Sequence, residues 1–161
     1  MKLDQKYMAL IQEAERRGIA DIESMRICFE VLSLASTIDR ECASLLAPHM
    51  LSEGRFVILS LLAGSVDGMA PNELADKAGV TRATISGLLD GLERDELIKR
   101  KVDRTDRRAL VIVLTSKGKE IAGQVVDQHS RWIAGLFGSL STLERAQLTK
   151  LLDKVTERSD L

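Results

Sequence analysis

Aromatic residues, cysteines and prolines are all scarce in this sequence of 161 residues: 3% of the chain is Phe, Trp or Tyr, and there are two cysteines and two prolines. A core with so few rings must consist of aliphatic side chains, which favours helices over a β-sandwich. Cys28 and Cys42 fall on one predicted helix, about 20 Å apart along its axis, so they cannot bridge each other. We therefore expect reduced thiols, as in a cytoplasmic protein.

Long apolar runs are missing as well. Residues 1–20 are charged throughout and lack the apolar centre of a signal peptide. The longest apolar runs, such as residues 56–59, are far too short to span a bilayer. We expect a soluble protein with no membrane partner.

The chain also lacks an excess of either charge, because its formal net charge is −1. A non-specific nucleic-acid coat would be strongly basic, so any contact with nucleic acid must come from a local patch. With 45% hydrophobic and 29% charged residues, the composition is that of a folded domain.

Helical periodicity and capping signals predict long helices at both ends of the chain and shorter ones between them. We expect helices at residues 4–17, 22–46, 53–62, 71–77, 82–95 and 115–138, and a last one after a capping box of Ser141 and Glu144. Strands are predicted at residues 98–102 and 109–114, joined by the charged turn 103–107. The helix at 22–46 is apolar on two sides, and a second subunit would be a natural source of cover for it.

The segment Pro71–Glu96, PNELADKAGVTRATISGLLDGLERDE, predicts a helix-turn-helix with a tight turn at Gly79–Val80. The second helix starts with side chains and free N–H groups suited to phosphates and base edges. The candidate DNA-binding residues in it are Thr81, Arg82, Thr84 and Ser86. The alternative for Thr81 and Thr84 is that they serve only as capping residues. We expect Thr81 to do both, capping the helix and binding phosphate.

The predicted hairpin is basic. Six basic residues stand against two acidic ones between Ile98 and Arg108. An arginine at the tip of such a hairpin can enter the narrow minor groove of DNA. The alternative is a solvated charged hairpin without a binding role.

These residues resemble the MarR family. The resemblance is carried by ELADKAGVTRATISGLLDGLERDELIKR followed by KVDRTDRRALVIVLTSKGKE, with the hairpin pattern D-x-x-D-R-R and the Leu-Thr-x-x-Gly sequence that starts the next helix. It implies a mainly α fold with a small β-hairpin, in which a winged helix-turn-helix lobe at residues 52–114 is flanked by a helical dimerisation lobe at residues 1–47 and 115–161. It also implies a homodimer that binds double-stranded DNA at a pseudo-palindromic operator.

The resemblance assigns roles within the hairpin tip. It makes Arg108 the first candidate for insertion into the minor groove, oriented by Asp106, with Arg107 and Arg104 as second choices. It also implies a small aromatic or anionic effector bound between the two lobes, for which Arg55 is the candidate carboxylate partner.

Two positions depart from the family pattern. Gly87 stands in the recognition helix where a longer polar or basic side chain is common, so a base contact is expected to be missing there. Glu96 stands where the family has glycine, and because a non-glycine residue resists positive φ, we expect a different backbone at the turn into the hairpin.

Other reactive groups are weighed against a structural role. Cys28 and Cys42 are either redox sensors or idle thiols. His49 and His129 lack the spacing of metal ligands, and the apolar stripe Trp132–Phe137 is expected to serve in packing. We find no catalytic motif, so neither an enzyme, a metal site nor a cofactor is expected.

The sequence therefore predicts a DNA-binding transcriptional regulator, acting as a repressor and released by a small-molecule signal, with a redox signal as the second choice. The alternative is a winged-helix module that binds protein rather than DNA.

Overall fold

The computed structural model describes residues 3–102 and 110–157, and its chain divides into two compact units, Met1–Glu53 and Gly54–Leu161. Most of the described residues are helical, and one two-stranded antiparallel sheet accompanies them. No single helix among these residues is long and apolar enough to cross a membrane. The bent pair formed by residues 22–49 and 53–63 reaches that length and apolar composition only when its two helices are counted together.

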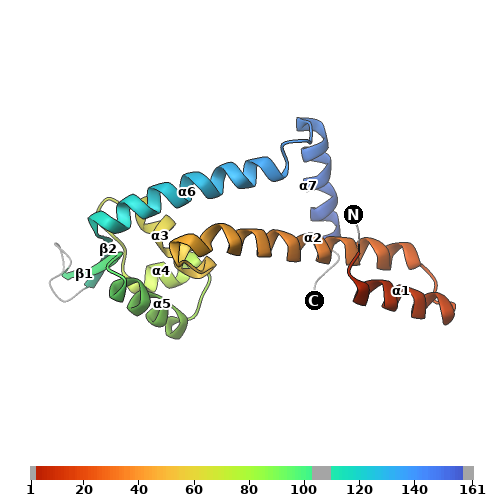
Figure 1. Ribbon diagram of the computed structural model, residues 1–161, viewed down its shortest axis with the longest axis horizontal. Helices are drawn as coiled ribbons and strands as arrows, with labels where there is room; N and C mark the ends of the chain where they lie inside the picture. Colours follow the sequence, from red (N-terminus) through yellow and green to blue (C-terminus); the bar gives the residue numbers. More distant parts are fainter. Residues whose placement is uncertain (1–2, 103–109, 158–161) are drawn as a thin grey trace. The chain divides into compact units, whose positions relative to one another are not determined.

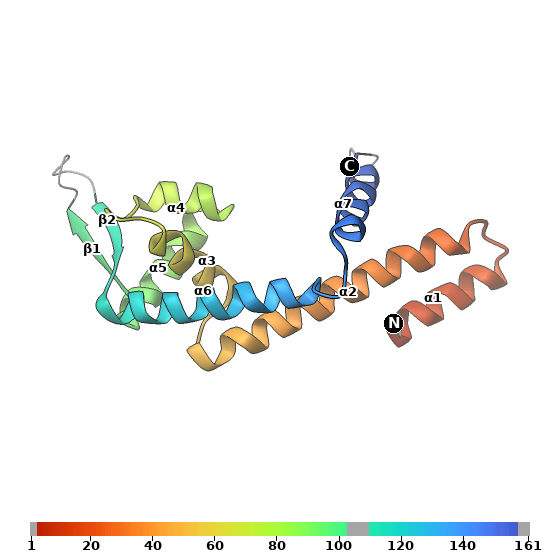
Figure 2. The same ribbon diagram turned by 90° about the horizontal axis from the view of Figure 1, so that it is seen from above.

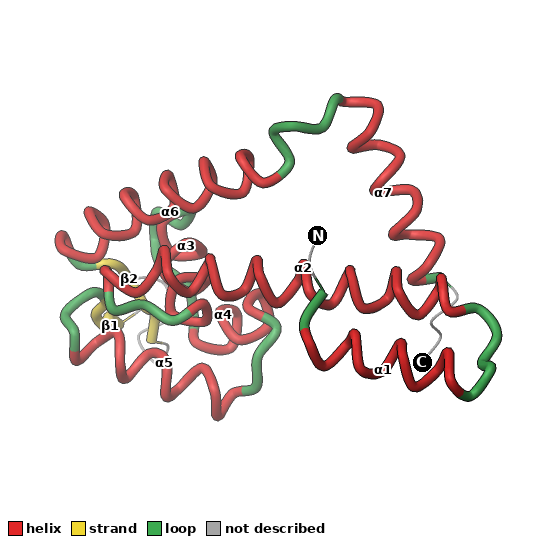
Figure 3. Tube along the Cα trace, turned by 45° about the vertical axis from the view of Figure 1, so that its right-hand side comes forward, coloured by secondary structure: helices red, strands yellow, loops and turns green. Residues whose placement is uncertain are grey.

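The first unit is a helical hairpin. Helix α1 (Gln5–Arg16) lies beside the first half of α2 (Ile22–Leu46), which continues into the short 3₁₀ helix η1 (Ala47–His49) (Figure 3). The rings of Tyr7 and Phe29 stack with centroids 4.7 Å apart, and Ile11 and Ala14 are buried. The side chain of Asp21 caps α2 by accepting a hydrogen bond from the backbone N–H of Ser24.

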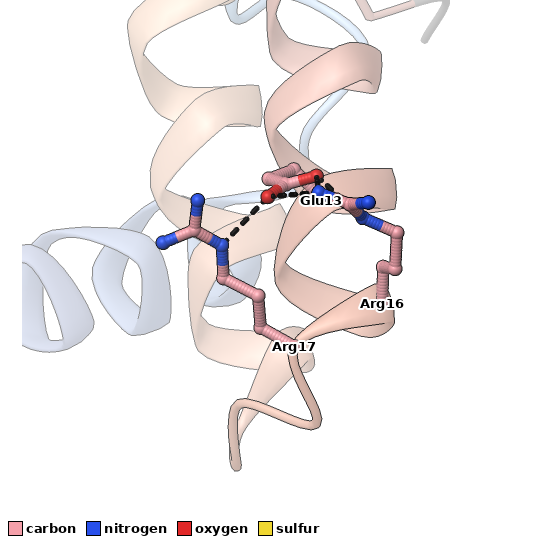
Figure 4. Close-up of polar contacts among 3 residues, drawn as sticks. All are labelled: Glu13, Arg16 and Arg17. Carbon is pink, nitrogen blue, oxygen red and sulfur yellow. Dashed lines mark hydrogen bonds and ion pairs between the residues drawn. The ribbon is translucent and has the colours of Figure 1, made fainter.

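Three charged side chains form hydrogen bonds with one another at the C-terminal end of α1. The carboxylate of Glu13 accepts hydrogen bonds from Arg16 Nε at 2.9 Å and from Arg17 Nε at 2.6 Å (Figure 4). These hydrogen bonds lower the pKa of Glu13. The side chains of Arg16 and Arg17 are exposed and that of Glu13 is half-buried, so these ion pairs lie at the surface and contribute little to stability.

The second unit contains a small layered core. It comprises α3 (Glu53–Ala63), α4 (Pro71–Ala78), α5 (Arg82–Arg94), strands β1 (Ile98–Val102) and β2 (Leu110–Leu114), α6 (Ser116–Leu136) and α7 (Thr142–Thr156) (Figure 1). The capping box of Ser141 and Glu144 at the start of α7 is confirmed. Aliphatic side chains from helices and strands fill this core: Ile58, Leu59, Leu62, Leu74, Leu89, Leu92, Ile98, Ile112 and Val125.

The hairpin is held to the rest of the second unit on both sides. Ile98 pairs with Leu114 and Val102 with Leu110 in the antiparallel ladder. The loop before α4 extends the sheet by one bridge, in which the backbones of Met69 and Ile112 exchange hydrogen bonds of 3.0 and 2.8 Å. The described part of the hairpin, strands β1 and β2, is therefore fixed at its base against the rest of the second unit (Figure 2).

Glycine is required where α6 begins. A Cβ on Gly118 would lie 1.8 Å from the carbonyl oxygen of Leu97, far inside van der Waals contact. The side chain of Thr115 caps the same turn by accepting a hydrogen bond from the N–H of Gly118, and its hydroxyl donates to Glu96 O at 2.7 Å. The first turn of α6 is thus locked onto the segment that leads into β1.

The expectation of a different backbone at Glu96 is wrong. Glu96 has a φ of 61°, in the left-handed region that glycine usually occupies. Its N–H donates to Glu93 O at 3.0 Å, and the next N–H, of Leu97, donates to Leu92 O at 2.9 Å. These two hydrogen bonds form the Schellman motif, and together with the Thr115 hydroxyl they hold the strained residue in place.

Candidate nucleic-acid interface

Helices α4 and α5 form the predicted helix-turn-helix. Gly79, with a φ of 65°, ends α4, and Thr81 caps α5 by accepting from the backbone N–H of Thr84. Leu74 and Ala75 of α4 are buried. The facing side of α5 is buried too, through Ile85, Leu89 and Leu92. The apolar faces therefore fix α5 in the second unit and leave its other face exposed.

The exposed face of α5 carries the predicted contact residues. Thr81, Arg82, Thr84 and Ser86 are all exposed. The hydroxyls of Thr81 and Thr84 lie 2.9 Å apart, and that of Ser86 donates to Arg82 O at 3.0 Å. Each hydroxyl keeps an acceptor lone pair, but its donor capacity is partly used within the helix.

Arg82 is the strongest contact group in this first turn. Its guanidinium is exposed, and it forms no ion pair with any residue that the structure describes. A shallow cavity of about 440 Å³ opens beside it, lined also by Pro71 and Asn72 at the start of α4. Five N–H donors facing outward at a helix N-terminus suit a phosphate or a guanine edge.

Gly87 lies on the same exposed face. A Cβ added there would meet no atom within 4 Å, so α5 has open space at this position. The missing base contact at Gly87 stays a prediction.

The hairpin contacts α5 through Arg100, which sequence reasoning counted only as part of the basic cluster. Arg100 Nη2 lies 2.5 Å from Asp90 Oδ1, and its Nε lies 3.2 Å from Glu93 Oε2. These pairs connect β1 to the second half of α5. Because Arg100 lies two residues after the buried Ile98, both side chains share one face of β1, and strand periodicity carried a signal for this inward role.

The four predicted residues of the hairpin tip, Arg104, Asp106, Arg107 and Arg108, lie outside the described residues. Their roles stay predictions.

Arg55, the candidate ligand contact, has partners within the second unit. Its guanidinium pairs with the Asp95 carboxylate and donates to Gly91 O at 3.2 Å, and its side chain is 18% exposed. The hydrogen bond from Arg55 lowers the pKa of Asp95. Lys117 Nζ donates to Asp95 O at 2.9 Å, so α3, the end of α5 and the start of α6 meet here. A ligand contact of Arg55 stays a prediction.

The cysteines and histidines have contrasting surroundings. Cys28 is exposed, whereas Cys42 is half-buried, and burial raises the pKa of its thiol. The His129 ring lies between those of Phe56 and Trp132, with centroids 4.6 and 5.3 Å away. Among the described residues, no group of three His, Cys, Asp or Glu side chains could hold a metal ion.

A helix-turn-helix followed directly by a β-hairpin defines a winged helix-turn-helix protein, and comparisons with known proteins agree. A MarR family model matches residues 51–109. The HTH-type transcriptional repressor YetL of Bacillus subtilis (strain 168) is 33% identical over 154 residues, which cover 95% of this chain and 92% of YetL. The HTH-type transcriptional regulator TtmR of Methylorubrum extorquens (strain PA1) is 30% identical over 126 residues, which cover 78% of this chain and 64% of TtmR.

Solved structures show the same fold. The structure of the S. aureus MepR–DNA complex matches with a TM-score of 0.69 at 25% identity, over 81% of this chain and 94% of MepR. The chain therefore belongs to the MarR family of winged helix-turn-helix, DNA-binding transcriptional regulators. The relatives are transcriptional regulators rather than enzymes.

Proposed function

We propose that the chain is a homodimeric repressor that binds a pseudo-palindromic operator and is released by a small-molecule signal. The observation that carries this proposal is the exposed polar first turn of α5, presented by a buried apolar face and followed at once by a basic hairpin. MepR, a protein of the same fold, has been solved in complex with DNA.

Exposed apolar side chains support the homodimer. In the first unit Leu10, Ile27 and Val31 are each about half exposed, between 49% and 54%. Near the other end of the chain, α7 has no buried residue, and Leu143 and Val155 are both 68% exposed. Both terminal segments thus carry apolar side chains that a second copy of the chain would cover.

Major-groove contacts are assigned to Thr81, Arg82, Thr84 and Ser86. Arg108 is assigned to the minor groove, with Asp106 orienting it, and Arg107 and Arg104 are the second choices for this insertion. Burial raises the pKa of the Cys42 thiol, which lowers its fraction of reactive thiolate and counts against Cys42 as a redox sensor.

Replacing Arg82 tests the DNA-binding assignment. Arg82→Ala is expected to weaken operator binding by about 1–3 kcal/mol, because the guanidinium contacts a base edge or phosphate. Fluorescence anisotropy with labelled operator DNA measures the change. Arg94→Ala is the matched control, because Arg94 is exposed in the last turn of the same helix. Equal affinities for the two variants would contradict the assignment.

A further inference from the structure

A second candidate site lies in a cavity of about 690 Å³ in the second unit, and none of the residues assigned above to the DNA grooves lines it. Its walls come from the end of α3 and the following loop, from the hairpin, and from the start of α6. Cavities of roughly 300–1,000 Å³ are the size that holds small-molecule ligands. The cavity is therefore large enough for an organic molecule of moderate size.

Positive charge dominates the cavity. Lys99 and Lys101 line it from alternate positions of β1, and Lys119 lines it from α6. Among the described residues that line it there is no Asp or Glu, and none of the three lysines forms an ion pair with a described residue. Three like charges around one cavity repel each other, and an anion between them would offset that repulsion.

The start of α6 adds to the positive potential. Its first turn contains no acidic residue, contrary to the usual preference for negative charge at a helix N-terminus, and Lys119 of this turn lines the cavity. The Thr115 hydroxyl accepts a hydrogen bond from the N–H of Gly118, and the Thr115 carbonyl accepts one from the N–H of Lys119. Ser116, the first residue of this 21-residue helix, lines the cavity. The helix dipole and the lysines thus favour the same ligand charge.

The rest of the wall is apolar. Val66 and Val113 line the cavity, and Val66 is almost fully exposed, at 99%. Leu62 and Leu114 lie deeper and are buried. An inorganic ion would leave these surfaces in water, whereas a ligand with an apolar body would cover them.

The cavity and the DNA-contacting helix lie on opposite faces of β1. Arg100 points from β1 to Asp90 and Glu93 of α5, and the side chains of Lys99 and Lys101 alternate with it. Bound DNA along α5 would therefore not fill the cavity. One strand separates the two sites.

We propose that this cavity binds a small organic anion, whose carboxylate, sulfonate or phosphate group lies among Lys99, Lys101 and Lys119 while its apolar body packs on Val66 and Val113. The inference goes beyond the proposed function, because it requires neither DNA nor a second subunit.

An NMR titration of the full chain with anilinonaphthalene sulfonate tests the proposal, read at the backbone amides of Gly64, Gly68 and Gly123. All three glycines line the cavity, so their shifts distinguish this site from binding elsewhere. Phenylnaphthylamine, the same molecule without the sulfonate, is the uncharged control. We expect saturable shifts at these amides with the sulfonate and none with the uncharged compound.

Two variants that act by different routes keep the test decisive. Lys99→Gln/Lys119→Gln removes two positive charges. Its affinity for the sulfonate, measured from the shifts of these amides, is expected to fall about tenfold or more. Gly123→Leu fills the cavity without changing charge, because a Cβ at Gly123 meets no atom within 4 Å. It is expected to abolish the shifts at the amides of Gly64 and Gly68, which this variant retains.

Matched controls on α6 complete the design. Lys117→Gln removes a charge from the same helix turn at a residue outside the cavity lining, and Gly135→Leu adds a side chain at another open position. Both should bind like the unaltered protein. Absence of shifts in the unaltered protein, equal shifts with the uncharged compound, or binding that survives in both cavity variants would overturn the proposal.

Discussion

The backbone of Glu96 lies in the left-handed region, at a φ of 61°, where a side chain costs about 1 kcal/mol or more relative to glycine. Its strain is tolerated because hydrogen bonds on both sides fix the turn between α5 and β1. At Glu96 the hydrogen bonds of the folded turn therefore outweigh the preference of a non-glycine residue for negative φ.

Glu96→Gly is expected to stabilise the protein by about 1 kcal/mol, since glycine adopts this φ without strain. Urea unfolding followed by circular dichroism measures the change in the free energy of unfolding. Glu96→Ala is the control, because alanine removes the carboxylate but keeps the Cβ. A larger gain for alanine than for glycine would show that charge rather than backbone strain is responsible.

The lowered pKa of Asp95 leads us to expect that the free energy of unfolding depends on pH. Its pKa is held below the ordinary value by the hydrogen bond from Arg55, so the ionised form is favoured in the folded state. Its contribution is then fully present above the unfolded pKa, about 3.9, and is lost as the pH falls through the lower folded pKa. The difference in unfolding free energy between the unaltered protein and Asp95→Asn should be constant from neutral pH to about pH 5 and shrink in more acidic solution.

The same interaction is visible at the carboxyl group itself. In an NMR titration the Asp95 carboxyl should titrate below about 3.9 in the unaltered protein and move upward in Arg55→Gln. A titration that is unchanged by the loss of Arg55 would show that this ion pair does not cause the shift.

At the scale of elements, the contact between α6 and the segment before β1 depends on the absence of a side chain at Gly118. Gly118→Ala is expected to destabilise the protein by about 1–3 kcal/mol or more, because its Cβ would overlap the Leu97 carbonyl. Gly123→Ala, on the same helix but in open space, should instead stabilise it by about 0.5–1 kcal/mol. Thermal unfolding of the two variants tests the pair, and destabilisation by both would contradict the account.

Elements defined by local chemistry were predictable from the sequence. The cap at Thr81 and the capping box of Ser141 and Glu144 are confirmed, because each depends on residues within one helical turn.

Contacts between elements were not predictable in this way. The pairs of Arg100 with Asp90 and of Arg55 with Asp95 join residues 10 and 40 positions apart. Their formation depends on how helices and strands pack. Within the candidate site, the sequence therefore identified the exposed residues of α5, but it missed Arg100 as the side chain that joins the hairpin to that helix.

At the scale of the whole molecule, each chain carries one helix-turn-helix and exposed apolar residues in both terminal segments. A symmetric dimer would present two copies of α5 to DNA, with half-sites about 34 Å apart, one turn of the duplex. Because the net charge of the chain is −1, attraction to DNA must come from the local basic groups of α5 and the hairpin.

Selection of bound sequences from a random duplex library by the purified protein tests this account most directly, with anisotropy across a salt series on the selected DNA. The account predicts an enriched inverted repeat with half-sites about one turn apart, bound with an affinity that falls steeply as salt rises. Enrichment of isolated half-sites, or repeated selections without enrichment across a panel of candidate effectors, would contradict it.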